Sequence, residues 1–553
     1  MRGNWRRRWP AIAAVISCCL VILVSCQQSS RDLRQTSGGV GASSQGDRIR
    51  LGTTAQIVTL DPAEAYEQSS MMAIANLGEP LYHYEQNDQG ELTLVPKLAR
   101  DLPTISDDQL TYRIPLRRDV VFHDGTPFNA AAMAFSLRRF RDNRGRPSFL
   151  LADLVDNIEA SGEYELTLSL NYPFAGFTSL LTFPGLCAIS PAAYNIGEGQ
   201  FLPNQFIGTG PYRLANYGSD SVAFDIFQDY WGQPPNNQGV DMRRFSSQSN
   251  LYNAFRTGGV DVAYQQLDPD QIHSLQELAP SEGYQIIAAE STTISYLVLN
   301  VNQPPFDRLE VRQALAAVID RDLLNQRVFY GQADPLYSLL PPAFEAHRPL
   351  FATQYGDGNV SQSRELLHQA GFSPENPLVV EIWFPSSSVA GRLSATILQA
   401  FAERNLPGLM TVEPRSVEAA TAYGYLDKGV YPTFLLSWYA DFFDADNYVK
   451  PFLECQEGSV ESGCTLGESQ YHGSFYYDPL ANQLLQQQRE ASDPQQRNAL
   501  LVELQEIVAA EVPYIPLWQN KDYAFAQPDI SGVRLSKTQQ VLPFASISPL
   551  NSE

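Results

Sequence analysis

Cysteine and histidine are the side chains of this 553-residue sequence best able to form covalent or metal bonds, and there are six of each. Cys455 and Cys464 stand nine residues apart in the loop-like stretch CQEGSVESGC. In an oxidising compartment this spacing favours a small disulfide loop, with two free thiols as the alternative. The histidines are scattered, and no CxxC or HxxxH pattern accompanies either cysteine, so we expect no metal site.

The common catalytic motifs are missing from the sequence. It contains no GxSxG, no P-loop, no Rossmann fingerprint and no HExxH. Gly208-Thr209-Gly210 is a weak match to a phosphate loop, because the following Lys and Ser/Thr are absent. Neighbouring carboxylates such as Asp444 and Asp446 are common in acidic chains, and we expect turn residues there. We therefore predict a protein that is not an enzyme and needs no cofactor.

The N-terminus carries the layout of an export signal. Arg2 and Arg6–Arg8 precede an uncharged apolar stretch that ends in Leu23-Val24-Ser25-Cys26. This ending resembles a bacterial lipobox, which predicts a signal peptide over residues 1–25 and a diacylglyceryl group on Cys26. We expect an exported protein, lipid-anchored to the bacterial membrane on its periplasmic or cell-surface side. An uncleaved anchor helix or an ordinary cleaved signal would leave the body on that same side.

Residues 26–47 are rich in Gln, Ser and Gly, which predicts a flexible tether to the membrane. The chain beyond them is long enough for two or three domains of roughly 100–200 residues each. A hydrophobic content of 44% indicates a packed globular body, and a net charge of −23 argues against a nucleic-acid partner. We expect this body to be a monomer.

Strand and helix patterns alternate along the body. IRLGT from Ile49 and YELTLSL at 164–170 alternate as strands do. Apolar spacing predicts helices over 69–77, 130–143, 311–329 and 498–512, the second of them capped by Asn129. The mixture indicates an α/β or α+β architecture.

Several segments, in order, resemble bacterial extracellular solute-binding protein family 5, the dipeptide- and oligopeptide-binding receptors of ABC importers. They are Leu60-Asp61-Pro62, Gly78–Leu81, the signature-like stretch 118–139, Gly208–Tyr212 and the stretch 300–321. The resemblance runs from about residue 48 to 530. The physical roles of these segments look structural, since Asp124-Gly125-Thr126 suits a turn and Asn129 suits a helix cap.

The resemblance implies an α/β, two-lobed periplasmic-binding-protein-like fold (type II, cluster C) with a third, inserted domain. Residues 48–75, 203–292 and 516–553 would form domain I, residues 76–202 the inserted domain II, and residues 293–515 domain III. The chain would cross between the lobes near 291–297 and 513–517, and these two crossings would act as a hinge.

The resemblance also implies a ligand site. In peptide-binding members a Trp and, three residues later, an Asp line the cleft, and these match Trp438 and Asp441 here. Asp441 would meet the α-ammonium of a peptide, Tyr439 and Ala440 would lie along its backbone, and Arg415 is a candidate for its carboxylate. The partners would be a peptide and the ABC permease in the membrane. Two alternatives remain: Asp441 caps a turn beside a core Trp438, or the fold binds a nickel chelate, haem, glutathione or an oligosaccharide.

Overall fold

The structure, a computed structural model, describes residues 48–87, 92–264, 267–538 and 541–550. The predicted signal peptide, Cys26 and the tether lie outside the described residues. Contacts group residues 49–553 into one compact unit. Within the described ranges, no helix combines the length and the hydropathy needed to span a membrane.

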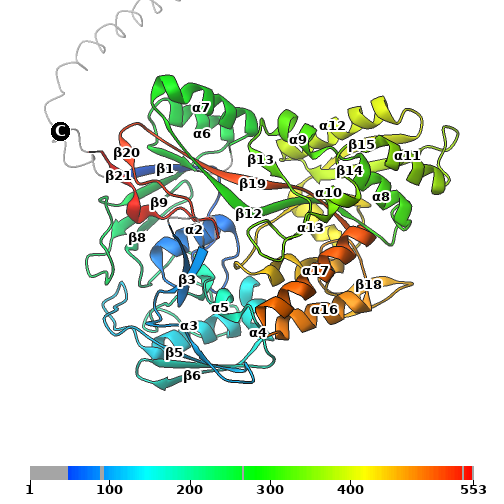
Figure 1. The fold of residues 1–553 in the computed structure, drawn as a ribbon. Helices are drawn as coiled ribbons and strands as arrows, with labels where there is room; N and C mark the ends of the chain where they lie inside the picture. Colours follow the sequence, from blue (N-terminus) through cyan, green and yellow to red (C-terminus); the bar gives the residue numbers. More distant parts are fainter. Residues whose placement is uncertain (1–47, 88–91, 265–266, 539–540, 551–553) are drawn as a thin grey trace, which may run out of the picture. The chain divides into compact units, whose positions relative to one another are not determined.

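A mixed sheet runs through this unit (Figure 1). Among the described residues its strand order is β16-β12-β19-β11-β1-β10-β9-β8, and β13 pairs with β19. β1 is parallel to β10 and β11, whereas the other pairs are antiparallel. The strand bounds are β1 Ile49–Thr53, β8 Tyr212–Tyr217, β9 Ser221–Ile226, β10 Val240–Arg244, β11 Val262–Tyr264, β12 Gln285–Leu299, β13 Ala333–Pro335, β16 Thr433–Trp438 and β19 Tyr514–Ala526.

The long strands β12 and β19 connect two hydrophobic cores. They pair from Gln285 opposite Ala526 to Val298 opposite Tyr514, with a register shift between Glu290 and Ile294. Ala524 and Ala526, near one end of this ladder, belong to the first core, while β12 from Ile294 onward belongs to the second. The crossings expected near 291–297 and 513–517 fall on these two strands. The hinge itself stays a prediction.

The first core includes a small antiparallel sheet of order β4-β5-β7-β6. Its strands are β4 Thr104–Ile105, β5 Thr111–Pro115, β6 Val155–Gly162 and β7 Glu165–Leu170, and the hairpin β2 Tyr82–Gln86 with β3 Leu92–Pro96 lies in the same part of the chain. All lie within 76–202, the range expected for the inserted domain. Their buried residues join those of β1 in one continuous cluster, and the domain boundaries stay predictions.

Helix α3, Ala130–Asp142, confirms the helix and the cap expected there. The Asn129 side chain accepts a hydrogen bond from the Ala132 amide at 3.0 Å, which satisfies one of the unpaired donors of the first turn. Near its other end, Arg139 donates to both carboxylate oxygens of Asp61 at 2.7 Å. The Leu60-Asp61-Pro62 segment and the 118–139 segment are therefore joined inside the protein, as expected for residues that support the fold.

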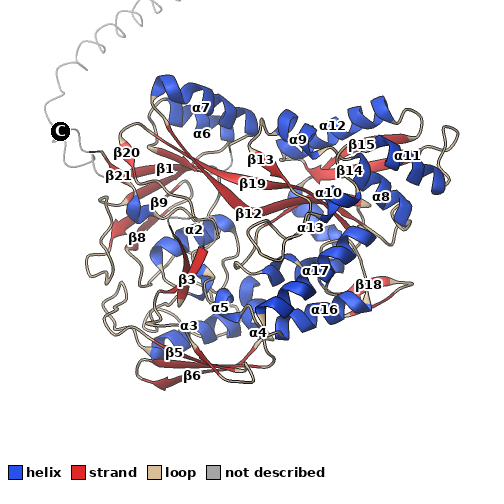
Figure 2. Cartoon of the chain, viewed as in Figure 1, coloured by secondary structure: helices blue, strands red, loops and turns tan. Residues whose placement is uncertain are grey.

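The second core surrounds the parallel pair β14 Leu378–Pro385 and β15 Met410–Val417. Helix α12, Val389–Asn405, packs on both strands. Helices α8 Leu309–Val318, α9 Arg321–Val328 and α11 Val360–Gln369 lie in the same part of the unit (Figure 2). The other helices of eight or more described residues are α2 Gln68–Leu77, α6 Gln248–Arg256, α7 Pro269–Glu282, α13 Ala419–Leu426, α16 Pro479–Glu490 and α17 Pro494–Glu511.

The single helix expected over 311–329 is wrong. The chain forms α8, Leu309–Val318, and then α9, Arg321–Val328. Ile319 is extended, and the Asp320 side chain accepts from the Leu323 amide at 2.8 Å, so a new N-cap interrupts an otherwise continuous apolar pattern.

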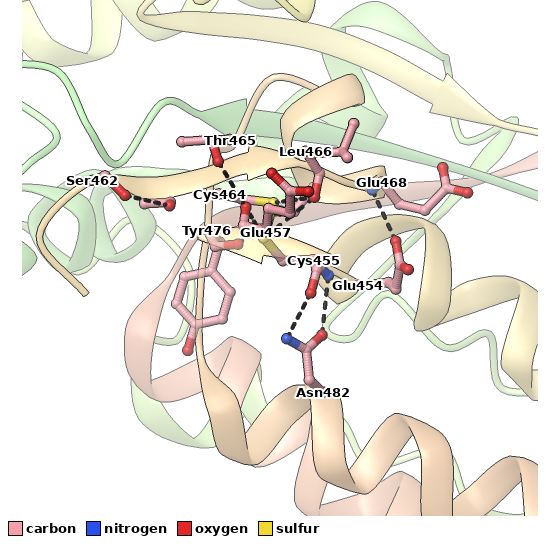
Figure 3. The surroundings of a disulfide bond; sticks show 12 residues. Glu454, Cys455, Glu457, Ser462, Cys464, Thr465, Leu466, Glu468, Tyr476 and Asn482 are labelled. Atoms are coloured by element: carbon pink, nitrogen blue, oxygen red, sulfur yellow. Dashed lines mark hydrogen bonds between the residues drawn. A yellow bond between two sulfur atoms is a disulfide. The ribbon is translucent and has the colours of Figure 1, made fainter. Parts of the chain in front are cut away.

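Cys455, just before β17 Glu457–Ser459, forms a disulfide with Cys464 of β18 Gly463–Leu466, and the two strands make a hairpin (Figure 3). The Asn482 side chain exchanges hydrogen bonds with the amide and the carbonyl of Cys455, at 3.0 and 2.9 Å. These bonds attach the hairpin to α16. The short helix α15, Glu468–Tyr471, follows directly and leads to the ligand site described below.

Candidate ligand-binding site

A cavity of about 330 Å³ lies where β16 ends. Residues 436–441 line it, together with Tyr66, which precedes α2, and Gln68 and Met71 from the first turn of α2. The structure thus brings together Trp438, Tyr439, Ala440 and Asp441, all expected in the site from the sequence.

Strand pairing and one asparagine position this wall. β16 pairs with β12 so that Trp438 stands opposite Ile294, and the chain leaves the strand just after it. Asn447 then holds the loop, since its backbone carbonyl accepts from Trp438 Nε1 and its side chain accepts from the Asp441 amide, both at 2.8 Å. Asn447 is itself buried. Nothing in the sequence indicates this role, except that Asn447 stands six residues after Asp441.

The Asp441 carboxylate has hydrogen-bond partners but no cation. Burial raises its pKa to about 6, and the charge of Glu468 acts in the same direction. Hydrogen bonds with Tyr66 and Asn447 oppose that shift. No lysine, arginine or histidine of the described residues forms an ion pair with it. A part-buried carboxylate of this kind is ready to accept a charge-assisted bond from a ligand.

Aromatic side chains make up much of the remaining wall. Tyr66, Tyr296, Tyr423 and Tyr471 line the cavity together with Trp438. The ring of Trp438 also packs edge-on against Phe452, so this residue both joins the second core and faces the cavity. Aromatic faces attract cations and accommodate apolar side chains. Sequence reasoning missed the tyrosines, because they come from four distant segments.

Two neighbouring carboxylates differ from Asp441. Asp444 is buried and receives two bonds from Arg497, at 2.9 and 2.5 Å. Asp446 is buried too, with Arg489 Nε 3.5 Å away. Asp444 also accepts from the Asp446 amide, as a turn residue does. Since both charges are compensated within the protein, neither is available to a ligand.

The structure does not bring Arg415 to this cavity. Arg415 lies near the end of β15, where its guanidinium pairs with Glu413 at 2.5 Å and with Glu381 at 3.3 Å. It is absent from the cavity wall. The expectation that it meets a ligand carboxylate there is corrected, because Arg415 is held by these two glutamates on β14 and β15, which form a two-stranded sheet separate from that of β16.

His472 is the one histidine that lines this cavity among the described residues. Burial lowers its pKa, so the ring is neutral at pH 7. No group of three or more His, Cys, Asp or Glu side chains in the described ranges is arranged to hold a metal ion.

Comparison with known proteins identifies the family. The model of "Bacterial extracellular solute-binding proteins, family 5 Middle" matches residues 93–459. The chain belongs to this family. It is accordingly a solute-binding protein of an ABC importer, which confirms the resemblance noted in the sequence.

Individual relatives and solved structures agree with this assignment. The glutathione-binding protein GsiB of Salmonella choleraesuis is 27% identical over 491 residues, covering 88% of this chain and 91% of the relative. NikA from Brucella suis, solved with Fe(III)-EDTA, superposes with a TM-score of 0.78 at 22% identity over 91% of this chain and 99% of its own.

DppA from Helicobacter pylori, solved with the peptide STSA, gives a TM-score of 0.72 at 22% identity, covering 92% of this chain and 98% of its own. These structures confirm the expected α/β, type II periplasmic-binding-protein fold.

Proposed function

We propose that this chain captures peptides with a free α-ammonium group and delivers them to its membrane permease, with Asp441 as the countercharge of the ammonium. The observation that carries the proposal is a carboxylate in a cavity wall that forms no ion pair with any cation in the described part of the chain. Asp444 and Asp446 in the same stretch each have an arginine, so of these three carboxylates Asp441 is the one without an ion-pair partner among the described residues.

Burial of an uncompensated charge is costly, and a ligand ammonium removes that cost on binding. The aromatic wall suits the remainder of a peptide, because tyrosine and tryptophan rings contact apolar side chains and interact with cations. The edge of the wall at Trp438–Ala440 can pair with peptide backbone, which gives affinity independent of side-chain identity.

The names of the relatives are compatible with this ligand class. DppA was solved with a peptide, and glutathione, named for GsiB, is itself a small peptide with one ammonium group. NikA was solved with an iron chelate of EDTA, which is anionic. A carboxylate in the cavity wall disfavours an anionic chelate of this kind by like-charge repulsion, so such a chelate is the weaker alternative.

Calorimetric titration of the purified protein tests the proposal. Ala-Ala-Ala is compared with N-acetyl-Ala-Ala-Ala, which lacks the ammonium charge but keeps the backbone. We expect acetylation to weaken binding about 100-fold, since one fully desolvated charge-assisted contact is lost. Glutathione, nickel–histidine and Fe(III)-EDTA are titrated in the same way as alternative ligands. Equal binding of the free and acetylated peptides, or binding of a chelate alone, would contradict the proposal.

We further propose that the mature chain is a monomeric, non-catalytic receptor held at the membrane by an acylated Cys26. The support is the sequence of residues 1–26, together with a disulfide that suits an oxidising compartment. Metabolic labelling with an alkyne-tagged fatty acid should mark the protein, and Cys26→Ser should abolish both the label and the membrane association. A labelled Cys26→Ser variant would refute the anchor.

A further inference from the structure

A second cavity, of about 610 Å³, adjoins the first. Gln68 and Tyr439 belong to the walls of both, so the two spaces meet at these residues. Its other walls come from the start of α7, the start of α12 and the stretch Asn520–Tyr523 of β19. A ligand held at Asp441 has this space directly beyond Tyr439.

The charges in the wall of this second cavity are unequal. Asp268 and Asp522 contribute two carboxylates. Lys521 is the one cationic residue in this wall within the described part of the chain, and its Nζ is paired with Asp334 at 2.8 Å. Lys521 is therefore neutralised by Asp334, which does not line the cavity, and the charges of Asp268 and Asp522 leave the cavity negative.

Asp522 resembles Asp441 in its surroundings. Burial raises its pKa to about 6, and a hydrogen bond with Ser291 opposes that shift. No ion pair joins it to a lysine, arginine or histidine within the described ranges. Asp522 lines the same cavity as Tyr439, the residue shared by both spaces, and burial together with the charge of Asp522 raises the pKa of Tyr439 to about 12.

The strand register brings the two carboxylates to one region of the sheet. β16 and β19 lie on opposite sides of β12, with Trp438 opposite Ile294 and Asp522 opposite Ala289. Because β16 is antiparallel to β12, the chain beyond Trp438 runs alongside β12 residues of decreasing number. Asp441 therefore lies closer to the level of Ala289 than Trp438 does. With strands about 4.8 Å apart and about 3.3 Å per residue, the separation is on the order of 15 Å, which two or three peptide residues and one long side chain can span.

We propose that the second cavity receives a basic side chain of the bound peptide, with Asp522 as its countercharge. Apolar residues such as Phe329 and Ile272 would contact the methylene stem of a lysine or arginine, whose charged head reaches the carboxylate. A ligand carboxylate would meet two like charges in the same space. This inference rests on the proposed function and narrows its substrate class to peptides with a basic residue after the N-terminus.

The test uses tripeptides that differ only in charge at one position. Calorimetry compares Ala-Lys-Ala and Ala-Ala-Lys with their norleucine counterparts, which keep the stem and lose the ammonium, and with their glutamate counterparts. We expect at least one lysine peptide to bind about tenfold more tightly than its norleucine partner, and glutamate to bind most weakly. Equal affinities for lysine and norleucine at both positions would overturn the inference.

Substitutions test whether Asp522 is the residue responsible for the preference for lysine. Asp522→Asn should bring the lysine-to-norleucine affinity ratio to within about twofold, and Asp522→Glu, which restores the charge, should retain most of it. Asp229→Asn changes an exposed carboxylate that lines neither cavity and should leave the ratio unaltered. A lysine preference that persists in Asp522→Asn would assign it to another group.

The lysine-to-norleucine affinity ratio is unaffected by a general loss of affinity, so it can be measured even on a partly destabilised variant. If Asp522→Asn does not fold, the inference is tested by the lysine, norleucine and glutamate tripeptides on the unaltered protein and on Asp522→Glu. Failure of every free-amino peptide, Ala-Ala-Ala included, would refute the proposed function itself. Binding of Ala-Ala-Ala without charge discrimination would refute only the second site.

Discussion

Asp61 and Asp441 are two enclosed carboxylates with opposite surroundings. The Asp61 and Arg139 side chains are 0% and 1% exposed, and the carboxylate also accepts from the amides of Ala63 and Leu202. Asp441 has a tyrosine, an asparagine and an adjoining cavity. A charge compensated by the protein contributes to the fold, whereas a charge left without a cation contributes to binding.

The strongest perturbation of the first region is Arg139→Leu. It would leave Asp61 buried without its cation, and we expect a loss of about 3–5 kcal/mol in unfolding free energy. Chemical denaturation followed by circular dichroism measures it, with Arg100→Leu at an exposed position as the control. An unfolding curve unchanged from the unaltered protein would mean that the pair contributes nothing, and the contrast with Asp441 would fail.

The matching perturbation of the second region is Asp441→Asn. Peptide affinity should fall about 100-fold, equivalent to about 2.7 kcal/mol, because the ligand ammonium loses its countercharge. The unfolding free energy of the ligand-free protein should be unchanged or higher, because a costly charge is removed. Calorimetry and denaturation of the same sample give both values. A variant that loses stability and keeps its affinity would reverse the roles assigned here.

Asn129→Ala tests whether the signature-like segment supports the fold rather than the ligand. Loss of the bond to the Ala132 amide should cost about 1 kcal/mol of stability. Peptide affinity should stay within about twofold, since Asn129 lies in neither cavity wall. A selective loss of affinity at unchanged stability would assign this segment to the site.

The smallest expected effect is a pH dependence. The pKa values of Asp441 and Asp522 are about 6 in the folded protein, against an ordinary value of 3.8, so the folded state binds these protons more tightly than the unfolded chain. Their destabilising contribution is present above about pH 6 and is lost as the pH falls toward 4. Peptide affinity should weaken over the same interval, because the ligand ammonium needs the ionised form.

The measurement is the melting temperature of the ligand-free protein between pH 4.5 and 7.5. The double variant Asp441→Asn, Asp522→Asn should melt about 2 °C higher than the unaltered protein at pH 7.5, and this difference should shrink to about a third at pH 4.5. A constant difference across the range would show that neither carboxylate titrates abnormally.

Much of the local structure could be predicted from the sequence. The strand at Ile49, the cap at Asn129, the helix that ends before Pro513 and the disulfide pair all depend on residues close together in the chain. The split between α8 and α9 was missed because a single cap at Asp320 outweighed a continuous apolar pattern. Helices, strands, caps and short disulfide loops are set mainly by neighbouring residues, and tertiary contacts shift only where they begin and end.

The sequence by itself determined the family and the stretch that holds Trp438 and Asp441, and it predicts an export signal. It could not separate Asp441 from Asp444 and Asp446, which stand in the same stretch and are of the same type. Tertiary structure decided that, because the cations of Asp444 and Asp446 come from α16 and α17, about 40–50 residues further along the chain. It also excluded Arg415 from the cavity and brought Asp522 near it. Whether a charge is compensated depends on distant residues, and only the folded chain places them.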